Sequence, residues 1–197
     1  AIDETHTICV DLGGRRIIKK IAPDFFVIGK TIGGGMPVAA YGCTAKLAGR
    51  INELLADKSI DTSGVGGTLT GNALALAATR ATLSSTLRED DFARMIPLAT
   101  AWAEGVQHTI DAHSLPWNVQ QLGARAEYWF CPPPRDGAAA AAAVDAELDA
   151  FMHLFALNRG ILLTPFHNMA LLSPHHTHDD VGRHTAVFAD AVATLLK

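Results

Sequence analysis

One lysine stands where an apolar segment ends and a run of glycines is about to begin. Residues 25–28 are hydrophobic, Gly29 and Lys30 follow, and three glycines occupy positions 33–35. Desolvation at the end of a buried strand lowers the pKa of a lysine and favours the neutral amine, which is the nucleophile of Schiff-base chemistry. Glycines let the backbone approach a ligand closely. The spacing therefore indicates an amine that reacts with a carbonyl compound, and a solvated surface lysine is the alternative.

An acidic residue upstream is expected to share a sheet edge with this lysine. Asp3 ends a short strand-like segment at the start of the chain. Adjacent parallel strands bring their carboxyl ends to the same edge of a sheet, where ligands bind in α/β proteins. We interpret Asp3 and Lys30 as the electrostatic clamp and the covalent anchor of an aldehyde cofactor.

Composition excludes several classes of protein. The chain has 197 residues, a hydrophobic content of 49% and a formal net charge of -4, so it can bury a core and has no basic field for nucleic acid or an acidic membrane. Cys9, Cys43 and Cys131 form neither a CxxC pair nor an even set, which predicts a reducing cytoplasm. Because the first residues read as the end of a strand, we expect the chain to be part of a longer protein.

A second glycine-rich segment favours a phosphate site. Residues 64–69 fail as a dinucleotide fingerprint, since Leu69 stands where the last glycine of GxGxxG belongs. The segment at Lys30 fails as a phosphate loop, since Asp24 stands where its first glycine belongs. What remains is a turn with Thr68 and Thr70 at or near a helix start, which suits a single phosphate group. A glycine turn with a threonine N-cap is the alternative.

The histidines near the end of the chain have a structural explanation. His175, His176 and His178 precede two aspartates, and acidic residues are favoured in the first turn of a helix. This pattern predicts a helix start in preference to a metal site. His167 lies in a turn between two apolar runs and is a candidate for a substrate pocket.

Hydrophobic periodicity and turn residues predict an alternation of strands and helices. Gly160 is expected to cap the helix before it. A composition break after residue 112 predicts a domain boundary there. The predicted strands cover residues 25–28, 38–44, 126–130, 161–164 and 169–172, and the predicted helices cover residues 45–56, 72–87, 90–112, 138–157 and 179–196.

The order of these motifs resembles the class III aminotransferases, and most of all enzymes of the glutamate-1-semialdehyde aminomutase type. The likeness rests on the strand end at Asp3, the element ending in Lys30, the glycines at 33–35 with Met36 and Pro37, and the segment 67–72. The resemblance implies an α/β fold: the C-terminal part of a fold-type I large domain that binds pyridoxal 5'-phosphate (PLP) over residues 1–112, then a small α+β C-terminal domain over residues 113–197.

The resemblance also implies roles for single residues. Lys30 would form the Schiff base, Asp3 would pair with the pyridinium nitrogen, and Thr68 would hold the cofactor phosphate across a homodimer interface. Thr5 stands where the family places an apolar side chain on the pyridine ring. Arg125 is a candidate for the substrate carboxylate, although a salt bridge to Glu127 would explain it equally well.

Three functions remain open on these grounds. The first is transfer of an amino group from a donor to a keto or aldehyde acceptor. The second is an aminomutase or racemase with the same lysine and cofactor. The third is a catalytically silent fragment or pseudoenzyme that serves in dimerisation. In the family, the main phosphate-binding turn and the stacking aromatic precede the strand of Asp3, so this chain is not expected to assemble a complete site alone.

Overall fold

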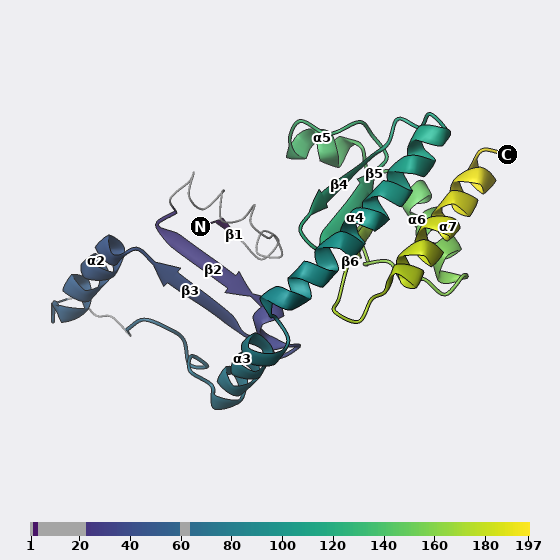
Figure 1. The fold of residues 1–197 in the computed structure, drawn as a ribbon. Coiled ribbons are helices and arrows are strands. Elements are labelled where there is room, and N and C mark those ends of the chain that lie inside the picture. The colour runs from purple at the N-terminus through teal and green to yellow at the C-terminus, as the bar shows by residue number, and fades with distance from the viewer. Residues whose placement is uncertain (1, 4–22, 60–63) are drawn as a thin grey trace. The chain divides into compact units, whose positions relative to one another are not determined.

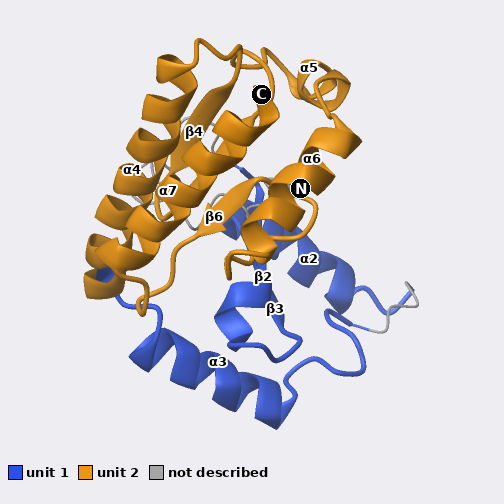
Figure 2. Cartoon of the chain, turned by 90° about the vertical axis from the view of Figure 1, so that its right-hand side faces the viewer, with its two compact units in different colours: residues 1–89 blue, residues 90–197 orange. Residues whose placement is uncertain are grey.

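The computed structural model describes residues 2–3, 23–59 and 64–197 of the chain (Figure 1). It divides into two compact units, residues 1–89 and residues 90–197 (Figure 2). The predicted boundary near residue 112 differs from this division by one helix, α4 (Glu89–Ala112). Trp102 and Val106 of that helix are almost fully buried in the core of the second unit, which explains why the helix belongs with it.

The first unit is built on a three-stranded sheet in the order β1-β2-β3. Strand β2 is parallel to β1 and antiparallel to β3, so the parallel pair predicted from the sequence is confirmed. Strand β2 is only half-buried, because Phe25 at its start is 39% exposed. The elements of this unit are β1 (Ile2–Asp3), β2 (Phe25–Gly29), the 3-10 helix η2 (Lys30–Gly33), β3 (Ala39–Cys43), α2 (Ala45–Ala56) and α3 (Ala73–Ser85).

Polar side chains define where the two α-helices of the first unit begin. The hydroxyl of Thr44 accepts a hydrogen bond from the backbone N–H of Leu47 at the start of α2. The side chain of Asn72 accepts one from Ala75 at 3.0 Å at the start of α3. Each side-chain oxygen satisfies an N–H group that the helix itself leaves unpaired. Both helices therefore begin within two residues of the predicted positions.

The second unit contains an antiparallel sheet in the order β4-β5-β6, as expected for a small α+β domain. Helices α4, α6 and α7 pack on one of its faces (Figure 1). The elements are α4, β4 (Asn118–Leu122), β5 (Arg125–Trp129), α5 (Gly137–Ala142), α6 (Ala146–Leu157), β6 (Met169–Leu171) and α7 (His178–Leu195).

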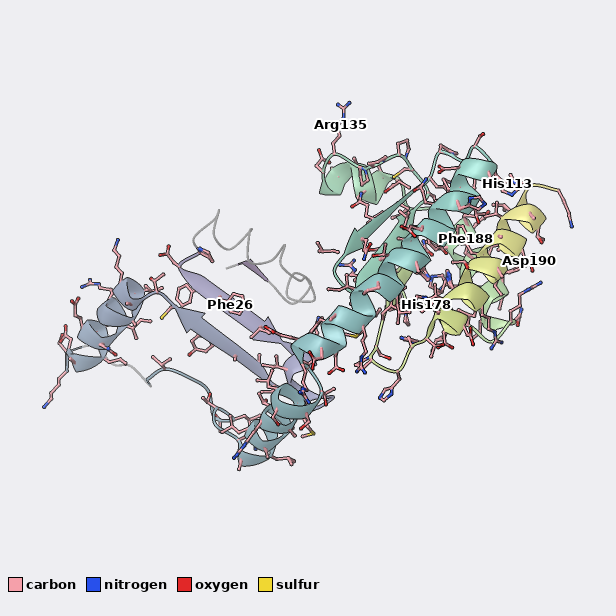
Figure 3. All side chains as sticks on the ribbon, viewed as in Figure 1. Phe26, His113, Arg135, His178, Phe188 and Asp190 are labelled. Atoms are coloured by element: carbon pink, nitrogen blue, oxygen red, sulfur yellow. The ribbon has the colours of Figure 1, made fainter. Side chains whose placement is uncertain are left out.

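The core of the second unit forms between this sheet and its helices. Strand β5 supplies Ala126 and Tyr128 to the core, and period-2 alternation turns Arg125 and Glu127 to the other face. Tyr128 packs against Phe188 of α7 with ring centroids 4.9 Å apart, and burial raises the pKa of the Tyr128 phenol far above its usual value. Figure 3 shows Phe188 on the inner side of α7 and Arg135 pointing away from the unit.

The prediction of one helix over residues 138–157 was wrong, because the chain forms two. Helix α5, which contains most of the alanine tract, ends at Ala142, and a separate helix, α6, begins at Ala146. Between them, one carboxylate oxygen of Asp145 accepts hydrogen bonds from Glu147 at 3.1 Å and Leu148 at 3.0 Å. This N-cap starts a second helix where alanine propensity alone predicts continuation.

The predicted strand at residues 161–164 is also absent. This segment follows a helix end in which Gly160 adopts a φ of 77° and Ile161 donates a backbone hydrogen bond to Ala156, so the capping role of Gly160 is confirmed. Strand β6 is present, but among the described residues it pairs with β5 alone. The apolar run at 161–164 therefore forms no ladder, and Leu162 is 81% exposed.

Within the described ranges, none of the helices is both long and apolar enough to cross a membrane.

Candidate active site

Lys30 occupies a strained backbone position directly after β2. Its φ is 59°, in the left-handed region that residues with a side chain rarely adopt. Its backbone N–H donates to the carbonyl of Val38 at 3.2 Å, which ties the residue to the start of β3. Backbone strain of this kind concentrates at functional sites, so the observed φ supports a special role for Lys30.

The side chain of Lys30 is exposed. The burial expected from the sequence is therefore not supplied by the described part of the chain. Within that part, its ammonium group makes no hydrogen bond or ion pair. The amine is accordingly available to another molecule or to another part of the protein.

The three glycines after Lys30 serve two different purposes. A Cβ atom on Gly33 would lie 2.3 Å from a methyl carbon of Val38, and one on Gly34 would lie 2.5 Å from the hydroxyl of Thr82 on α3. These two glycines let η2 pack closely on its neighbours. Gly35 has a φ of 98° and open space around it, so only this glycine faces a region where a ligand has room.

Asp3 lies beside this element in the sheet. In the parallel pairing of β1 with β2, Asp3 stands opposite Val27, three residues before Lys30. Three residues of extended chain span about 10 Å. The sheet therefore brings the backbone positions of Asp3 and Lys30 to the same edge, as predicted. Thr5 lies outside the described residues.

Thr68 lies in an exposed glycine turn before α3. The turn is closed by Thr70, whose hydroxyl oxygen accepts a hydrogen bond from the N–H of Gly67 at 2.6 Å. The N-cap of α3 is Asn72, so neither threonine caps the helix. The hydroxyl of Thr68 makes no hydrogen bond within the described ranges, which leaves it free to bind an anion.

The two candidates for substrate binding in the second unit converge on one carboxylate. Arg125 Nη2 lies 2.5 Å from Glu127 Oε2, and His167 Nδ1 lies 3.1 Å from Glu127 Oε1. The side chain of Glu127 is only 9% exposed. Glu127 thus uses both oxygens to hold Arg125 and the turn of His167 in place.

This arrangement bears on the choice that the sequence left open for Arg125. Its guanidinium pairs with Glu127, which neutralises the charge that would attract a substrate carboxylate. The next residue of the turn is held as well, because the side-chain amide of Asn168 donates to Asp149 at 2.6 Å. The cluster therefore fixes the turn to β5 and to α6, and no feature of the sequence indicated that His167 would join it.

The predicted helix start at these histidines is confirmed, since α7 begins at His178 and is preceded by His175 and His176. Thr177 accepts a hydrogen bond from the N–H of Asp180 and donates one to its carboxylate, which forms a capping box. The hydrogen bonds from Thr177 lower the pKa of Asp180. Among the described residues, no group of three or more potential ligands is placed to hold a metal ion.

The model of one protein family matches most of the chain. The family is described as "Aminotransferase class-III", and the match covers residues 16–180. The chain belongs to the class III aminotransferases. The mixed α/β architecture and the lysine at the end of a sheet strand, both predicted from the sequence, agree with this membership.

Curated relatives of this class III chain are named glutamate-1-semialdehyde 2,1-aminomutase. The protein from Opitutus terrae is 34% identical over 184 residues, which cover 93% of the chain and 42% of the relative. The protein from Thermomicrobium roseum is 31% identical over 187 residues, which again cover 42% of the relative. The chain therefore spans less than half the length of these relatives.

Solved structures agree with this assignment. A glutamate-1-semialdehyde aminomutase from Pseudomonas aeruginosa PAO1 is 44% identical and superposes with a TM-score of 0.90 over 98% of the chain and 44% of its own length. A lysine-to-alanine variant of that enzyme was solved in complex with PMP. A β-phenylalanine aminotransferase from Variovorax paradoxus shares the fold, with 22% identity and a TM-score of 0.80.

Proposed function

We propose that the protein containing this chain transfers an amino group from a donor to a keto or aldehyde acceptor with the help of PLP. The observation that carries the proposal is the position of Lys30, in a strained conformation at the end of β2 with a parallel strand ending at Asp3 beside it. Membership of the class III aminotransferases supports the same cofactor. The relative that binds PMP supports it further.

The described residues fit such a cofactor in their chemistry. PLP, when bound, withdraws electrons from the reacting carbon of an amino substrate. Lys30 offers an exposed primary amine, Thr68 offers a hydroxyl without a partner in the described ranges, and Gly35 leaves open space beside η2. These groups match an aldehyde, a phosphate and a close ligand approach.

Each of these residues then has a definite task. Lys30 would hold the cofactor through Nζ and, once released, would accept and return the proton of the reacting substrate carbon. Asp3 would keep the ring nitrogen protonated by its negative charge. Thr68 would donate its hydroxyl hydrogen to the cofactor phosphate, and Thr5 would lie near the ring.

The cluster at Glu127 indicates which residue of the second unit contacts substrate. Arg125 remains the candidate for a substrate carboxylate only if a substrate displaces Glu127 from it. His167 is 44% exposed at its side chain and keeps its other ring nitrogen for a ligand. We therefore propose that His167 contacts substrate and that Arg125 mainly orders the cluster.

A homodimer is the assembly that we propose for the whole protein. Residues on both sides of Thr68 are apolar and strongly exposed, with Val65 at 56% and Leu69 at 80%. Burying such side chains is favourable. A second subunit against this turn would cover them and bring Thr68 to the partner's cofactor. The reducing cytoplasm expected from the cysteines stays a prediction.

An intramolecular aminomutase is the second candidate function, and the names of the similar proteins reported above favour it. The two functions differ in whether the amino group leaves the substrate for an external acceptor. Full-length protein should be incubated with amino donors and a labelled keto acid. Label in a new amino acid supports the aminotransferase, whereas isomerised substrate without transfer supports an aminomutase, and a racemase would invert the substrate.

The covalent role of Lys30 is tested without any assay of turnover. Full-length protein would be incubated with PLP, reduced with borohydride, digested and analysed by mass spectrometry. The cofactor mass should appear on the peptide that contains Lys30, and the visible absorbance of the bound cofactor should vanish in Lys30→Ala. Lys46→Ala, which changes an exposed lysine on α2, should keep both signals. If both signals are absent in the unaltered protein, the enzyme proposal fails and a catalytically silent protein that serves in dimerisation is favoured.

A further inference from the structure

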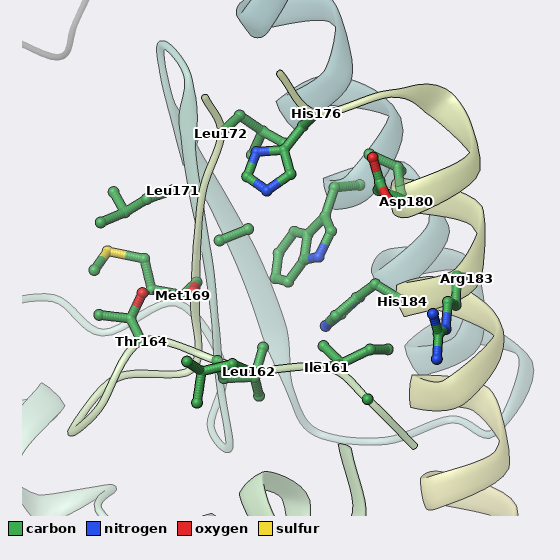
Figure 4. Close-up of a pocket in the computed structure, with 15 residues that line it drawn as sticks. Ile161, Leu162, Thr164, Met169, Leu171, Leu172, His176, Asp180, Arg183 and His184 are labelled. Atoms are coloured by element: carbon green, nitrogen blue, oxygen red, sulfur yellow. Dashed lines mark hydrogen bonds between the residues drawn. The ribbon is translucent and has the colours of Figure 1, made fainter. Parts of the chain in front are cut away.

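The second unit contains a cavity whose lining does not include Arg125, Glu127 or His167. Its volume is about 270 Å³. Two segments form its walls, residues 160–164 and residues 169–172, and α7 and Trp102 complete the lining (Figure 4). These two segments are the arms that lead into and out of the turn bearing His167. The cavity therefore lies at the base of that turn.

A buried histidine lines this cavity with a nitrogen that has no partner. His184 is 8% exposed. Its Nδ1 atom is buried beyond the reach of solvent, so Nε2, which makes no hydrogen bond among the described residues, is the ring nitrogen left to the cavity. Its ring lies 4.8 Å from that of Trp102, and burial lowers its pKa to about 4, so the ring is neutral at neutral pH. Nε2 of the neutral ring can therefore exchange a hydrogen bond with a polar group placed in the cavity.

A second histidine supplies a hydrogen-bond donor to the same cavity. The Nδ1 atom of His176 accepts a hydrogen bond from the backbone N–H of Ser173 at 2.8 Å. In a neutral ring the proton then resides on Nε2, which is left as a donor. Figure 4 shows His176 and His184 both pointing inward from the rim.

The charged residues of the lining are already engaged. The carboxylate of Asp180 accepts hydrogen bonds from Thr177, and Arg183 donates to the backbone carbonyl of Arg159 at 2.7 Å. The two charges are opposite and interact, since Arg183 contributes to lowering the pKa of Asp180, so together they add no net charge to the lining. The remaining wall is largely apolar, with Leu163 and Val181 buried in it.

We propose that this cavity is an accessory binding site for a small neutral molecule with an apolar body and one hydroxyl or amide group. A cavity of about 150 Å³ holds benzene, so this one has room for a single ring with a short polar arm. The polar arm would meet the two histidines, and the ring would contact Trp102 and the aliphatic wall. Because the ligand touches both arms of the turn, it would also stiffen the segment that positions His167.

Benzyl alcohol is a suitable probe, and toluene is its matched control without the hydroxyl. Binding to the full-length protein with its cofactor would be measured by isothermal titration calorimetry, with ligand-observed NMR for weak binding. Benzyl alcohol should bind at millimolar concentration or better, and toluene should bind more weakly. His184→Phe keeps a ring in the cavity but removes both nitrogens, and it should weaken benzyl alcohol about five- to tenfold.

Two further variants serve as controls for the binding of benzyl alcohol. His113→Phe changes an exposed histidine after the end of α4 and should leave the affinity unchanged. Lys30→Ala should also keep the affinity, so that loss of the proposed enzyme activity cannot be mistaken for loss of this site. The site is disproved if the unaltered protein does not bind benzyl alcohol, or if His184→Phe binds it equally well.

Discussion

The two units of the chain differ in how much hydrophobic surface they bury. Ile32 is the one hydrophobic side chain that is buried in the described part of the first unit, and all other buried hydrophobic residues lie in the second unit. Strand β3 is exposed at each of its five residues, and α2 buries none. The second unit, in contrast, closes a core around Trp102, Tyr128 and Phe188.

The candidate catalytic residues therefore lie in one unit, and the hydrophobic core that stabilises the chain lies in the other. Lys30 and Thr68 belong to the first unit, whose apolar side chains are uncovered. A few hundred Å² of contiguous apolar surface usually marks an interface, and Leu74 and Leu76 of α3 are 64% and 56% exposed. Since the chain spans about 42% of its curated relatives, we expect other parts of the protein to cover the first unit and complete its site.

The largest effect on stability is expected in the core of the second unit. Trp102→Ala should lower the free energy of unfolding of that unit by about 3–5 kcal/mol, because it removes a large side chain that is 2% exposed. Urea unfolding of chain 1–197, followed by circular dichroism, would measure this. Tyr41→Ala, at a 55% exposed position of β3, should change stability by less than about 0.5 kcal/mol. Equal losses would mean that the first unit has a core of its own.

The next effect concerns catalysis and should leave stability unchanged. Asp3→Asn in the full-length protein should reduce kcat by about 10²–10³, because it removes an electrostatic partner of the reacting group. The cofactor should remain on Lys30, as judged by borohydride reduction. Asp24→Asn alters an exposed carboxylate just before β2 and serves as the matched control. Turnover close to normal in Asp3→Asn would remove Asp3 from the mechanism.

The sequence predicted the local elements of the first unit well because each rests on neighbouring residues. The strand predicted at residues 25–28 and the helices predicted from residues 45 and 72 all begin within one residue of those positions in the structure. The strain at Lys30 could not be predicted, since the φ of 59° occurs together with a hydrogen bond to Val38, which lies eight residues away. The roles of Asp3, Thr5 and Thr68 stay predictions.

The second unit was harder because its decisive contacts are distant in sequence. Glu127 meets His167 across forty residues, and no spacing rule joins a strand residue to a turn so far along the chain. His184 was missed, yet its spacing from Val181 and Phe188 places all three on the buried side of α7. Asp145 carried the signal that splits the helix, but the alanine tract before it has the stronger propensity.

Acid should destabilise the second unit through His184. Its pKa falls from 6.5 to about 4 on folding, so the unfolded chain binds a proton that the folded unit resists. The stabilising effect is complete above pH 6.5 and is lost as the pH falls toward 4, with a total on the order of 3 kcal/mol. Urea unfolding at several pH values would give the free energy of unfolding as a function of pH. Its decrease between pH 6.5 and pH 4 should be smaller in His184→Gln, whereas the exposed His113→Gln should keep the decrease of the unaltered protein.

The smallest effect compares one helix cap from each unit. Asp145 accepts two backbone hydrogen bonds at the start of α6, so Asp145→Ala should lower the free energy of unfolding of the second unit by about 1 kcal/mol. Asn72 caps α3 in the first unit with one such bond, and Asn72→Ala should leave that transition unchanged. Both variants would be measured by urea unfolding of chain 1–197. If Asn72→Ala lowers the free energy of unfolding in that transition by as much, the two units unfold as one cooperative body. The first unit would then contribute to the stability of the second, contrary to the comparison drawn above.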